Sequence, residues 1–256
     1  ESWIIGDRTM DIQTGMNAGL ATVLVRTGLG GKDGRFDVRP DFTFDNLEEA
    51  VAFIVERREA LLAEMAPVVE LAADSRGTGP FVIALGGQAR SGKSTLARLL
   101  ARALGKRGVS TRLLSLDNWL VGAPERTADM TVRERYRYRD IEHDIARLLA
   151  GESIELARYD AYRRTAAPGG AFSLDGAHCL IVDGVAALDV PFLRDVSSCR
   201  LFVDVPEPQR RQRFFAFYRW KNMPEHEIDA LYGERLVDEV PFIEDSREYA
   251  QIIVGI

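Results

Sequence analysis

One short segment, residues 87–94 with the sequence GQARSGKS, constrains this chain more than any other feature. It fits the phosphate-binding pattern G-x-x-x-x-G-K-[ST] at every fixed position. The apolar run 81–85 precedes it, and a helical pattern of leucines at 96, 99, 100 and 104 follows. Strand, glycine turn and helix is the order that presents backbone N–H groups and a helix N-terminus to an anion. The segment therefore predicts a phosphate-binding loop, and the alternative is a glycine-rich turn with a chance lysine.

Each part of this loop has a chemical role in binding a nucleoside triphosphate. Its glycines let the backbone approach phosphate oxygens closely. Lys93 is expected to reach the β- and γ-phosphates of ATP, and the Ser94 hydroxyl is expected to take a position on Mg²⁺. The residues predicted to hold the cofactor are Gly87, Gln88, Ala89, Arg90, Ser91, Gly92, Lys93, Ser94 and Thr95.

The composition of the 256-residue chain disfavours several other classes of protein. A hydrophobic content of 46% supplies a sizeable core, and a net charge of −6 disfavours a dedicated nucleic-acid binder. No apolar run approaches the length of a membrane span and no signal peptide is visible, so we expect a cytoplasmic protein without nucleic-acid or membrane partners. Cys179 and Cys199 are expected to be buried free thiols, because two cysteines without a histidine cluster make neither a disulfide framework nor a zinc site.

Strand and helix signals alternate along the chain, which indicates an α/β protein. Residues 74–80 (DSRGTGP) form the clearest linker, and we place the domain boundary there. After it we expect a P-loop NTPase-type parallel sheet with flanking helices. Its strands are predicted at 81–86, 111–116, 178–183, 200–205 and 251–254, and its helices chiefly at 93–107, 140–150 and 207–222. Before the linker we expect strands at 2–6 and 21–27, a helix at 11–19, a loop at 28–40, and a helix that begins after Asp45-Asn46 and that Pro67 kinks or ends.

Two of the predicted strands end in an acidic residue. Asp117 follows the second strand of the C-terminal part, and Asp183 follows Leu180-Ile181-Val182. Next to a phosphate loop, one such carboxylate can orient the attacking hydroxyl or act as a general base. The other can hold Mg²⁺ in a Walker-B-like manner, directly or through water. For Asp117 the alternative role is a helix N-cap.

The phosphate loop and these two acidic strand ends follow one another as they do in the uridine kinase/phosphoribulokinase group of P-loop small-molecule kinases. Residues 80–256 resemble that group. The resemblance implies that Asp117 lies beside the acceptor hydroxyl. The segment 158–164 is similar to the substrate segment of that family, which implies that Tyr159 and Asp160 contact the acceptor and that Arg163 or Arg164 neutralises charge. Many members carry glutamate where this chain has Asp183. Trp119 is a further candidate for the acceptor site, with a place in the core as the alternative.

The C-terminal part also resembles the family. In that family, an arginine-bearing lid follows the fourth strand. By resemblance, the lid candidates in this chain are Arg213, Arg219 and Lys221, because cations at such a place stabilise charge on the transferring phosphoryl group. A solvated arginine face is the alternative. The segment from Val240 to Ile253 is similar to the one that closes the family's sheet. The run 133–139 (RERYRYR) fits no family motif, and it indicates either a substrate contact or an exposed, salt-bridged helix.

Residues 4–19 (IIGDRTMDIQTGMNAG) resemble the last catalytic motif of haloacid-dehalogenase-type phosphatases, nearest the branch that acts on histidinol phosphate and heptose bisphosphate. The resemblance implies that Asp7 and Asp11 hold Mg²⁺. The D-x-D nucleophile motif and the lysine motif of that family are not recognisable. We therefore expect residues 1–60 to be a partial Rossmann-like phosphatase segment without turnover of its own, and we expect an upstream half that completes it.

Together these patterns predict an ATP- and Mg²⁺-dependent kinase that phosphorylates a hydroxyl of a small metabolite. The predicted organisation is a phosphatase-type segment at 1–60, a helix and linker at 61–79, and a kinase domain at 80–256. A nucleotide-binding regulatory module, or a scaffold attached to a sugar-phosphate phosphatase, is the alternative. The acceptor (nucleoside, sugar or sugar phosphate), the preference for ATP or GTP, and any homo-oligomer stay open.

Overall fold

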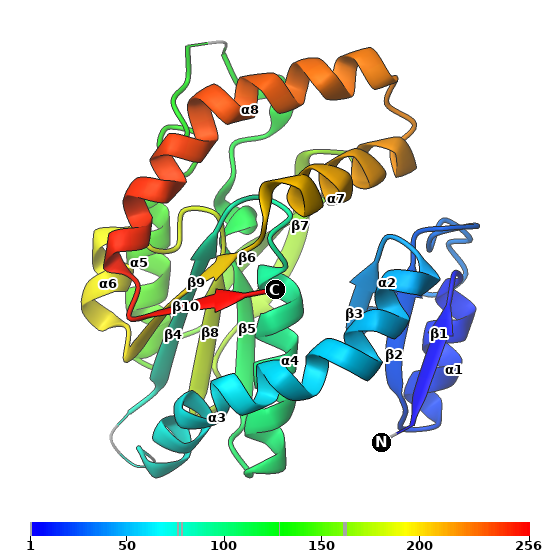
Figure 1. Cartoon of the computed structure of the whole chain (residues 1–256). Helices are drawn as coiled ribbons and strands as arrows, with labels where there is room; N and C mark the ends of the chain where they lie inside the picture. Colours follow the sequence, from blue (N-terminus) through cyan, green and yellow to red (C-terminus); the bar gives the residue numbers. More distant parts are fainter. Residues whose placement is uncertain (1, 76, 78, 128, 161–162) are drawn as a thin grey trace. The chain divides into compact units, whose positions relative to one another are not determined.

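The computed structural model describes residues 2–75, 77, 79–127, 129–160 and 163–256 (Figure 1). Its contacts divide the chain into two compact units. Unit 1 contains residues 1–64 and 206–232, and unit 2 contains residues 65–205 and 233–256. The helix that carries the lid candidates thus groups with the N-terminal residues.

Unit 2 is built on a parallel sheet whose five strands have the order β10-β9-β4-β8-β5 (Figure 1). The phosphate-loop strand β4 is central and buried along its whole length, which is why its sequence is continuously apolar rather than alternating. The α/β fold and the parallel sheet predicted from the sequence are confirmed. The strands are β4 (Phe81–Gly87), β5 (Thr111–Ser115), β8 (Cys179–Asp183), β9 (Cys199–Asp204) and β10 (Ile252–Gly255).

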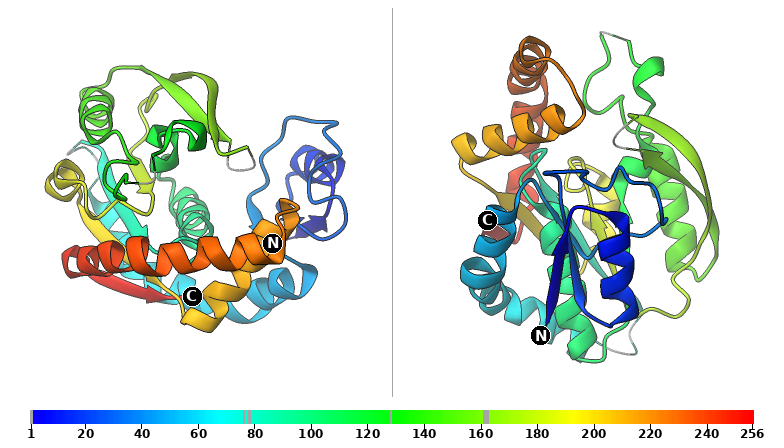
Figure 2. Two further views of the ribbon diagram at one scale, coloured as in Figure 1. Left: turned by 90° about the horizontal axis from the view of Figure 1, so that it is seen from above. Right: turned by 90° about the vertical axis from the view of Figure 1, so that its right-hand side faces the viewer.

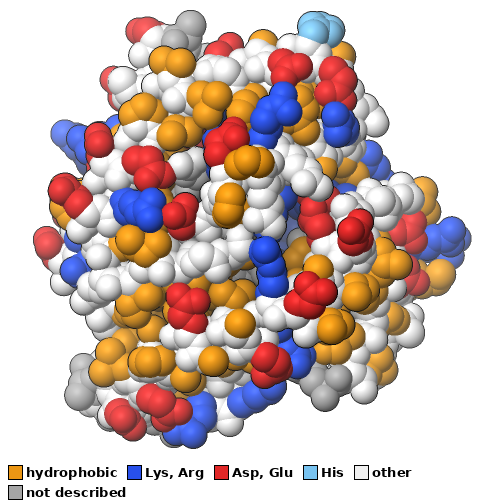
Figure 3. Space-filling view, viewed as in Figure 1, with side chains coloured by type: hydrophobic (Ala, Val, Ile, Leu, Met, Phe, Trp, Pro, Cys, Tyr) orange, Lys and Arg blue, Asp and Glu red, His pale blue; other side chains and the backbone are white. Residues whose placement is uncertain are grey.

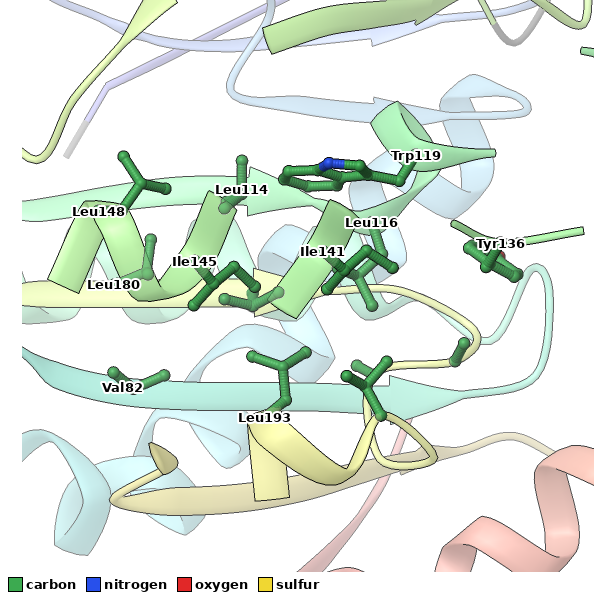
Figure 4. Close-up of a cluster of buried hydrophobic side chains, with 14 of the residues drawn as sticks. Val82, Leu114, Leu116, Trp119, Tyr136, Ile141, Ile145, Leu148, Leu180 and Leu193 are labelled. Atoms are coloured by element: carbon green, nitrogen blue, oxygen red, sulfur yellow. The ribbon is translucent and has the colours of Figure 1, made fainter. Parts of the chain in front are cut away.

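Helices connect these strands and cover the sheet. Helix α4 (Lys93–Lys106) packs against β4, β5 and β8. Helix α5 (Tyr138–Leu149) places Ile141, Ile145 and Leu148 in a core cluster with Leu114 and other strand side chains (Figure 4). Other helical segments of unit 2 are the second part of α3 (Arg58–Asp74), α6 (Pro191–Val196), and the short turns η2 (Leu116–Trp119), η3 (Ala123–Glu125) and η4 (Arg247–Tyr249).

Several elements were not expected from the sequence, and two of them lie near the candidate site. The first is an antiparallel hairpin of β6 (Ile154–Asp160) and β7 (Thr165–Phe172), whose second strand is mostly exposed and rich in alanine and glycine, a composition that favours loops. The second is the long helix α8 (Glu225–Ser246), which continues through Pro241. The sequence predicted no helix beyond residue 222, and residues 240–253 were described only by their similarity to the segment that closes the family's sheet.

Unit 1 contains a parallel three-stranded sheet of β1 (Trp3–Gly6), β2 (Ala21–Val25) and β3 (Phe42–Phe44). Helix α1 (Thr9–Asn17) packs against β1 and β2 (Figure 2). Asn46 caps α2 (Leu47–Ala52) by accepting a hydrogen bond from the Glu49 N–H, and a π-helical turn, η1 (Phe53–Arg57), leads on to α3. Helix α7 (Glu207–Trp220) and the first residues of α8 add an aromatic cluster that includes Phe214, Tyr218 and Tyr232.

On the face shown in Figure 3, acidic and basic side chains are interspersed with apolar ones. None of the helices in the described part of the chain is both long and apolar enough to cross a membrane.

The burial of the cysteines leads to a first prediction. Cys179 lies on β8 with none of its surface exposed, and burial raises the pKa of its thiol to about 12; burial also raises the pKa of Cys199. Because the thiolate is the reactive species, neither thiol is expected to react with Ellman's reagent in the folded protein. Both should react in denaturant. Rapid labelling of the native protein would contradict this placement of the two strands.

Candidate active site

The phosphate loop has the backbone geometry that its glycines predicted. Gly87 and Gly92 have φ angles of +135° and +102°, and Arg90 lies at +67°. A Cβ at Gly87 would collide with the carbonyl oxygen of Val203 on the neighbouring strand. Helix α4 begins directly after Gly92, so its first N–H groups point toward the loop. The loop is therefore a preformed cradle for phosphate oxygens.

Lys93 lies folded into this cradle. Its Nζ donates hydrogen bonds to the carbonyl oxygens of Gly87 (2.9 Å) and Gln88 (2.7 Å), and only 8% of the residue is exposed. Burial lowers the pKa of Lys93 to about 8, against the opposing effect of the carboxylates of Asp183 and Asp117. A triphosphate in the cradle would supply the negative charge that a buried ammonium group lacks.

Ser94 and Asp183 meet beside the loop. The Ser94 hydroxyl donates to Asp183 Oδ2 at 2.7 Å, and burial raises the pKa of the Asp183 carboxyl. The strand register explains the meeting, since Asp183 lies level with Leu85 on β4 and with Ser115 on β5. A hydroxyl and a carboxylate at this place form the hard oxygen donor set that suits Mg²⁺. The residues present thus fit the metal that the sequence predicted.

Asp117 lies one strand further along the same edge of the sheet. It belongs to the turn η2, whose N-cap is Ser115, so the capping role considered for Asp117 belongs to Ser115. Asp117 is half-buried, and burial raises the pKa of its carboxyl, while the nearby cations Lys93 and Arg90 lower it. The structure therefore brings Asp117 into the electrostatic neighbourhood of the phosphate loop.

Two other acceptor candidates, Trp119 and Tyr159, lie in different surroundings. Trp119 is 4% exposed, and its indole N–H donates to Asp144 at 2.9 Å, so it occupies the core (Figure 4). Tyr159 lies on β6, where its backbone N–H donates to Asn118 Oδ1 at 3.2 Å. The Asn118 side chain, which sequence reasoning missed, thus ties the hairpin to the turn that carries Asp117.

Asp160 accepts hydrogen bonds from Arg163 and Arg164, the two candidate arginines of the predicted substrate segment. Its side chain accepts a hydrogen bond from the backbone N–H of Arg163, and its carbonyl accepts one from Arg164. The Arg163 side chain is 79% exposed, whereas Arg164 has a positive φ of 59° and its carbonyl accepts from Ala123. Substrate roles for these residues stay predictions.

Residues 133–137 of the run 133–139 form an irregular segment, and only the last two residues of the run, 138 and 139, begin the helix α5. Arg133 makes a bidentate ion pair with the buried Asp189 (2.7 and 3.0 Å), to which the Tyr138 hydroxyl also donates. Arg135 pairs with Asp238 of α8. These arginines hold the segment in place, so the salt-bridged alternative describes it better than the substrate contact does.

The lid candidates lie in unit 1. Burial lowers the pKa of the Arg213 guanidinium, while the carboxylates of Glu49 and Asp45 act in the opposite direction. Arg219 pairs with Glu225, and the Lys221 ammonium lies 5.0 Å from the centre of the Phe217 ring. Arg213 therefore shares its surroundings with acids of the N-terminal segment, and the lid roles stay predictions.

Asp7 and Asp11 lie at the end of β1 and on the first turn of α1, as the phosphatase-type motif implied. Asp7 Oδ2 accepts the Leu29 N–H at 2.7 Å, and Asp11 Oδ2 accepts the Arg8 N–H at 3.1 Å. Among the described residues, no group of three or more histidine, cysteine or acidic side chains is arranged to hold a metal. A magnesium ion at this place would need further oxygen ligands from the backbone, water or a phosphate.

Comparison with known proteins identifies relatives of both parts. The HAD-hydrolase-like family model matches residues 1–50. The uridine kinase of Leuconostoc citreum is 29% identical over 188 residues, which cover 70% of this chain and 88% of that protein. The uridine kinase of Deinococcus deserti is 25% identical over 183 residues, covering 68% and 87%. The resemblances to uridine kinases and to haloacid-dehalogenase-type enzymes are thus confirmed.

Solved structures show the same fold. A Silicibacter protein provisionally described as a fructose transport system kinase aligns with a TM-score of 0.59 at 21% identity, over 75% of this chain and 98% of its own. A Bacillus stearothermophilus protein provisionally described as a uridine kinase aligns with a TM-score of 0.50 at 19% identity, over 75% and 99%. The kinase-like part of this chain therefore has the fold of P-loop kinases.

The crowding around Gly87 leads to a second prediction. Gly87→Ala places a Cβ against the Val203 carbonyl at a φ of +135°, so we expect it to lower the free energy of unfolding by more than about 1 kcal/mol. We also expect it to abolish MgATP binding. Gly105→Ala is the matched control, because a Cβ there meets nothing within 4 Å and alanine favours the helix by about 0.5–1 kcal/mol. Denaturant unfolding and calorimetric titration measure both effects, and an unchanged Gly87→Ala protein would contradict the geometry.

Proposed function

We propose that the uridine kinase-like part of this chain, residues 80–256, transfers the γ-phosphoryl group of ATP to a hydroxyl of a small metabolite, with Mg²⁺. The observation that carries the proposal is the convergence of three groups at one edge of the sheet. They are the buried Lys93, the Ser94–Asp183 pair and the half-buried Asp117. Phosphoryl transfer requires mainly positioning and electrostatic stabilisation, and these groups supply both.

Each group has a distinct task. Lys93 and the loop N–H groups bind the triphosphate, and Asp117 orients the acceptor hydroxyl and takes its proton. Ser94 and Asp183 would hold Mg²⁺, which when bound neutralises charge on the phosphates. The Lys93 ammonium would exchange its carbonyl contacts for phosphate oxygens.

The acceptor is proposed to be a nucleoside or a sugar. Relatives of this chain are described as uridine kinases, and one structural neighbour is provisionally described as a fructose transport system kinase. A carboxylate at the acceptor position also favours a hydroxyl-bearing group over a further anion. Attachment to a phosphatase-type segment suggests that the acceptor is a sugar-phosphate-derived metabolite.

Substitution of Asp117 provides the third prediction. Asp117→Asn keeps the shape of the side chain but removes its charge and basicity, so we expect kcat to fall by about 10²–10⁴-fold. The affinity for MgATP should change by less than about threefold, because Asp117 acts on the acceptor. The measurement is ADP formation with uridine, other nucleosides, fructose, other sugars and sugar phosphates as acceptors, alongside calorimetric titration of MgATP.

This experiment has two control variants, one expected to lose activity and one expected to keep it. Lys93→Ala should lose both binding and turnover, whereas Asp195→Asn, on the exposed surface of α6, should match the unmodified protein. MgATP binding without acceptor-dependent turnover in the unmodified protein would favour a nucleotide-binding regulatory module instead.

A further inference from the structure

Residues 233–246 of α8 are joined to both sides of the candidate active site. Near the middle of the helix, Asp238 pairs with Arg135. The backbone of residues 135–137 pairs with residues 119–121, at the end of the turn that carries Asp117. Further along, Glu244 accepts a hydrogen bond from Gln88 of the phosphate loop. At a rise of 1.5 Å per residue, these two anchors lie about 9 Å apart along the helix.

The inward face of this helix carries a charged pair. Glu239 is 7% exposed, and Arg235 donates to it at 2.6 Å with 20% of its own side chain exposed. One turn further on, the same face becomes apolar at Ile243, which packs with Ala84 of β4 and Phe202 of β9. Burying two charges costs free energy that a pair of apolar side chains would not. Stability therefore does not explain why Arg235 and Glu239 occupy this face of the helix.

The electrostatic surroundings of Asp117 indicate what the charged pair Arg235–Glu239 does at this place. Burial raises the pKa of Asp117; Lys93 and Arg90 lower it, Glu239 raises it and Arg235 lowers it. Burial also raises the pKa of Tyr136 well above its usual range, and Asp117, Glu239 and Arg235 act on this residue as well. The pair thus belongs to the same cluster as the group assigned to the acceptor and the lysine assigned to the phosphates.

We propose that Arg235, oriented by Glu239, is the cation that contacts the transferring phosphoryl group. This inference rests on the proposed function. In the reaction, the acceptor oxygen forms a bond to the γ-phosphorus, its proton passes to Asp117, and the bond to the β–γ bridging oxygen breaks, so that ADP leaves with that electron pair. Arg235 donates to the γ-phosphoryl oxygens during this exchange. Glu239 is a positioning residue that holds the guanidinium in place, as a carboxylate partner does for the phosphate-binding lysine of protein kinases.

The decisive experiment compares Arg235→Ala with Arg147→Gln in the full chain. Arg147 lies on α5 in an exposed pair with Glu152, so its loss controls for the removal of one surface cation. We expect Arg235→Ala to lower kcat by about 10²–10³-fold, with the KM for ATP changed by less than about threefold. Added guanidinium ion should restore part of the rate, an outcome that a purely structural role would not produce.

Glu239 is tested by two substitutions. Glu239→Gln, which keeps a hydrogen-bond acceptor, should lose less activity than Glu239→Ala, and neither should change the KM for ATP appreciably. The melting temperature of each variant is measured to confirm folding. If Arg235→Ala retains kcat within about threefold of the unmodified protein, or raises only KM, the proposal is overturned.

A measurement without an acceptor separates this inference from the proposed function. MgADP is titrated into each protein with and without aluminium fluoride, a mimic of the transferring phosphoryl group. We expect aluminium fluoride to tighten MgADP binding to the unmodified protein and to Arg147→Gln but not to Arg235→Ala. Equal tightening in all three proteins overturns the role of Arg235, whatever the turnover assay shows. Absence of turnover with every acceptor, together with the expected pattern here, overturns the proposed acceptor class alone.

Discussion

The burial of the Lys93 ammonium group is the constraint on which the rest of the candidate site depends. A buried cation is tolerated only where hydrogen-bond acceptors surround it, and here the carbonyl groups of Gly87 and Gln88 provide them. Those carbonyls are available because the loop turns back on itself at residues with positive φ. This loop conformation depends on the buried central strand β4 on one side and on the first turn of α4 on the other. Burial lowers the pKa of Lys93 to about 8, and an anion bound in the loop would favour the charged form of the ammonium group.

The sequence predicted most of unit 2, because its elements are specified locally. Apolar runs define β4, β8 and β9, and glycines mark the phosphate loop, so the positions of Lys93, Ser94 and Asp183 follow from chain order alone. The hairpin of β6 and β7 was not predicted, since its second strand consists mainly of small, exposed residues that carry no period-two pattern. Trp119 illustrates a different limit. An aromatic residue two positions after Asp117 fits a pocket wall equally well, and only its hydrogen bond to Asp144 and its packing with the α5 side chains assign it to the core.

Helix α8 shows why site residues are harder to predict than folds. Helix α8 runs through Pro241, but the sequence patterns predicted no helix over residues 225–246 and no role for Arg235 or Glu239. Their significance arises from two long-range contacts, between Arg135 and Asp238 and between Gln88 and Glu244. Such contacts join residues more than one hundred positions apart, and neither local propensity nor spacing specifies them. The arginines that sequence reasoning favoured, Arg213 and Arg219, were chosen because they follow a strand as a lid does in related kinases.

In the N-terminal segment, a residue of the phosphatase-like motif also has a structural role. The Asp7 carboxylate accepts the Leu29 N–H, and its carbonyl accepts the Gly31 N–H, so this motif residue shapes the loop that follows β2. That loop carries Lys32, whose ammonium donates to the Trp220 carbonyl at 2.6 Å and lies 5.1 Å from the indole ring. Arg26, which pairs with Asp45, lies 5.1 Å from the Phe217 ring of the same helix. These contacts are the reason that α7 and the phosphatase-type segment form one compact unit. Because Lys32 contacts Trp220, a change in the Asp7 loop would act directly on α7, the helix that carries the lid candidates Arg213 and Arg219.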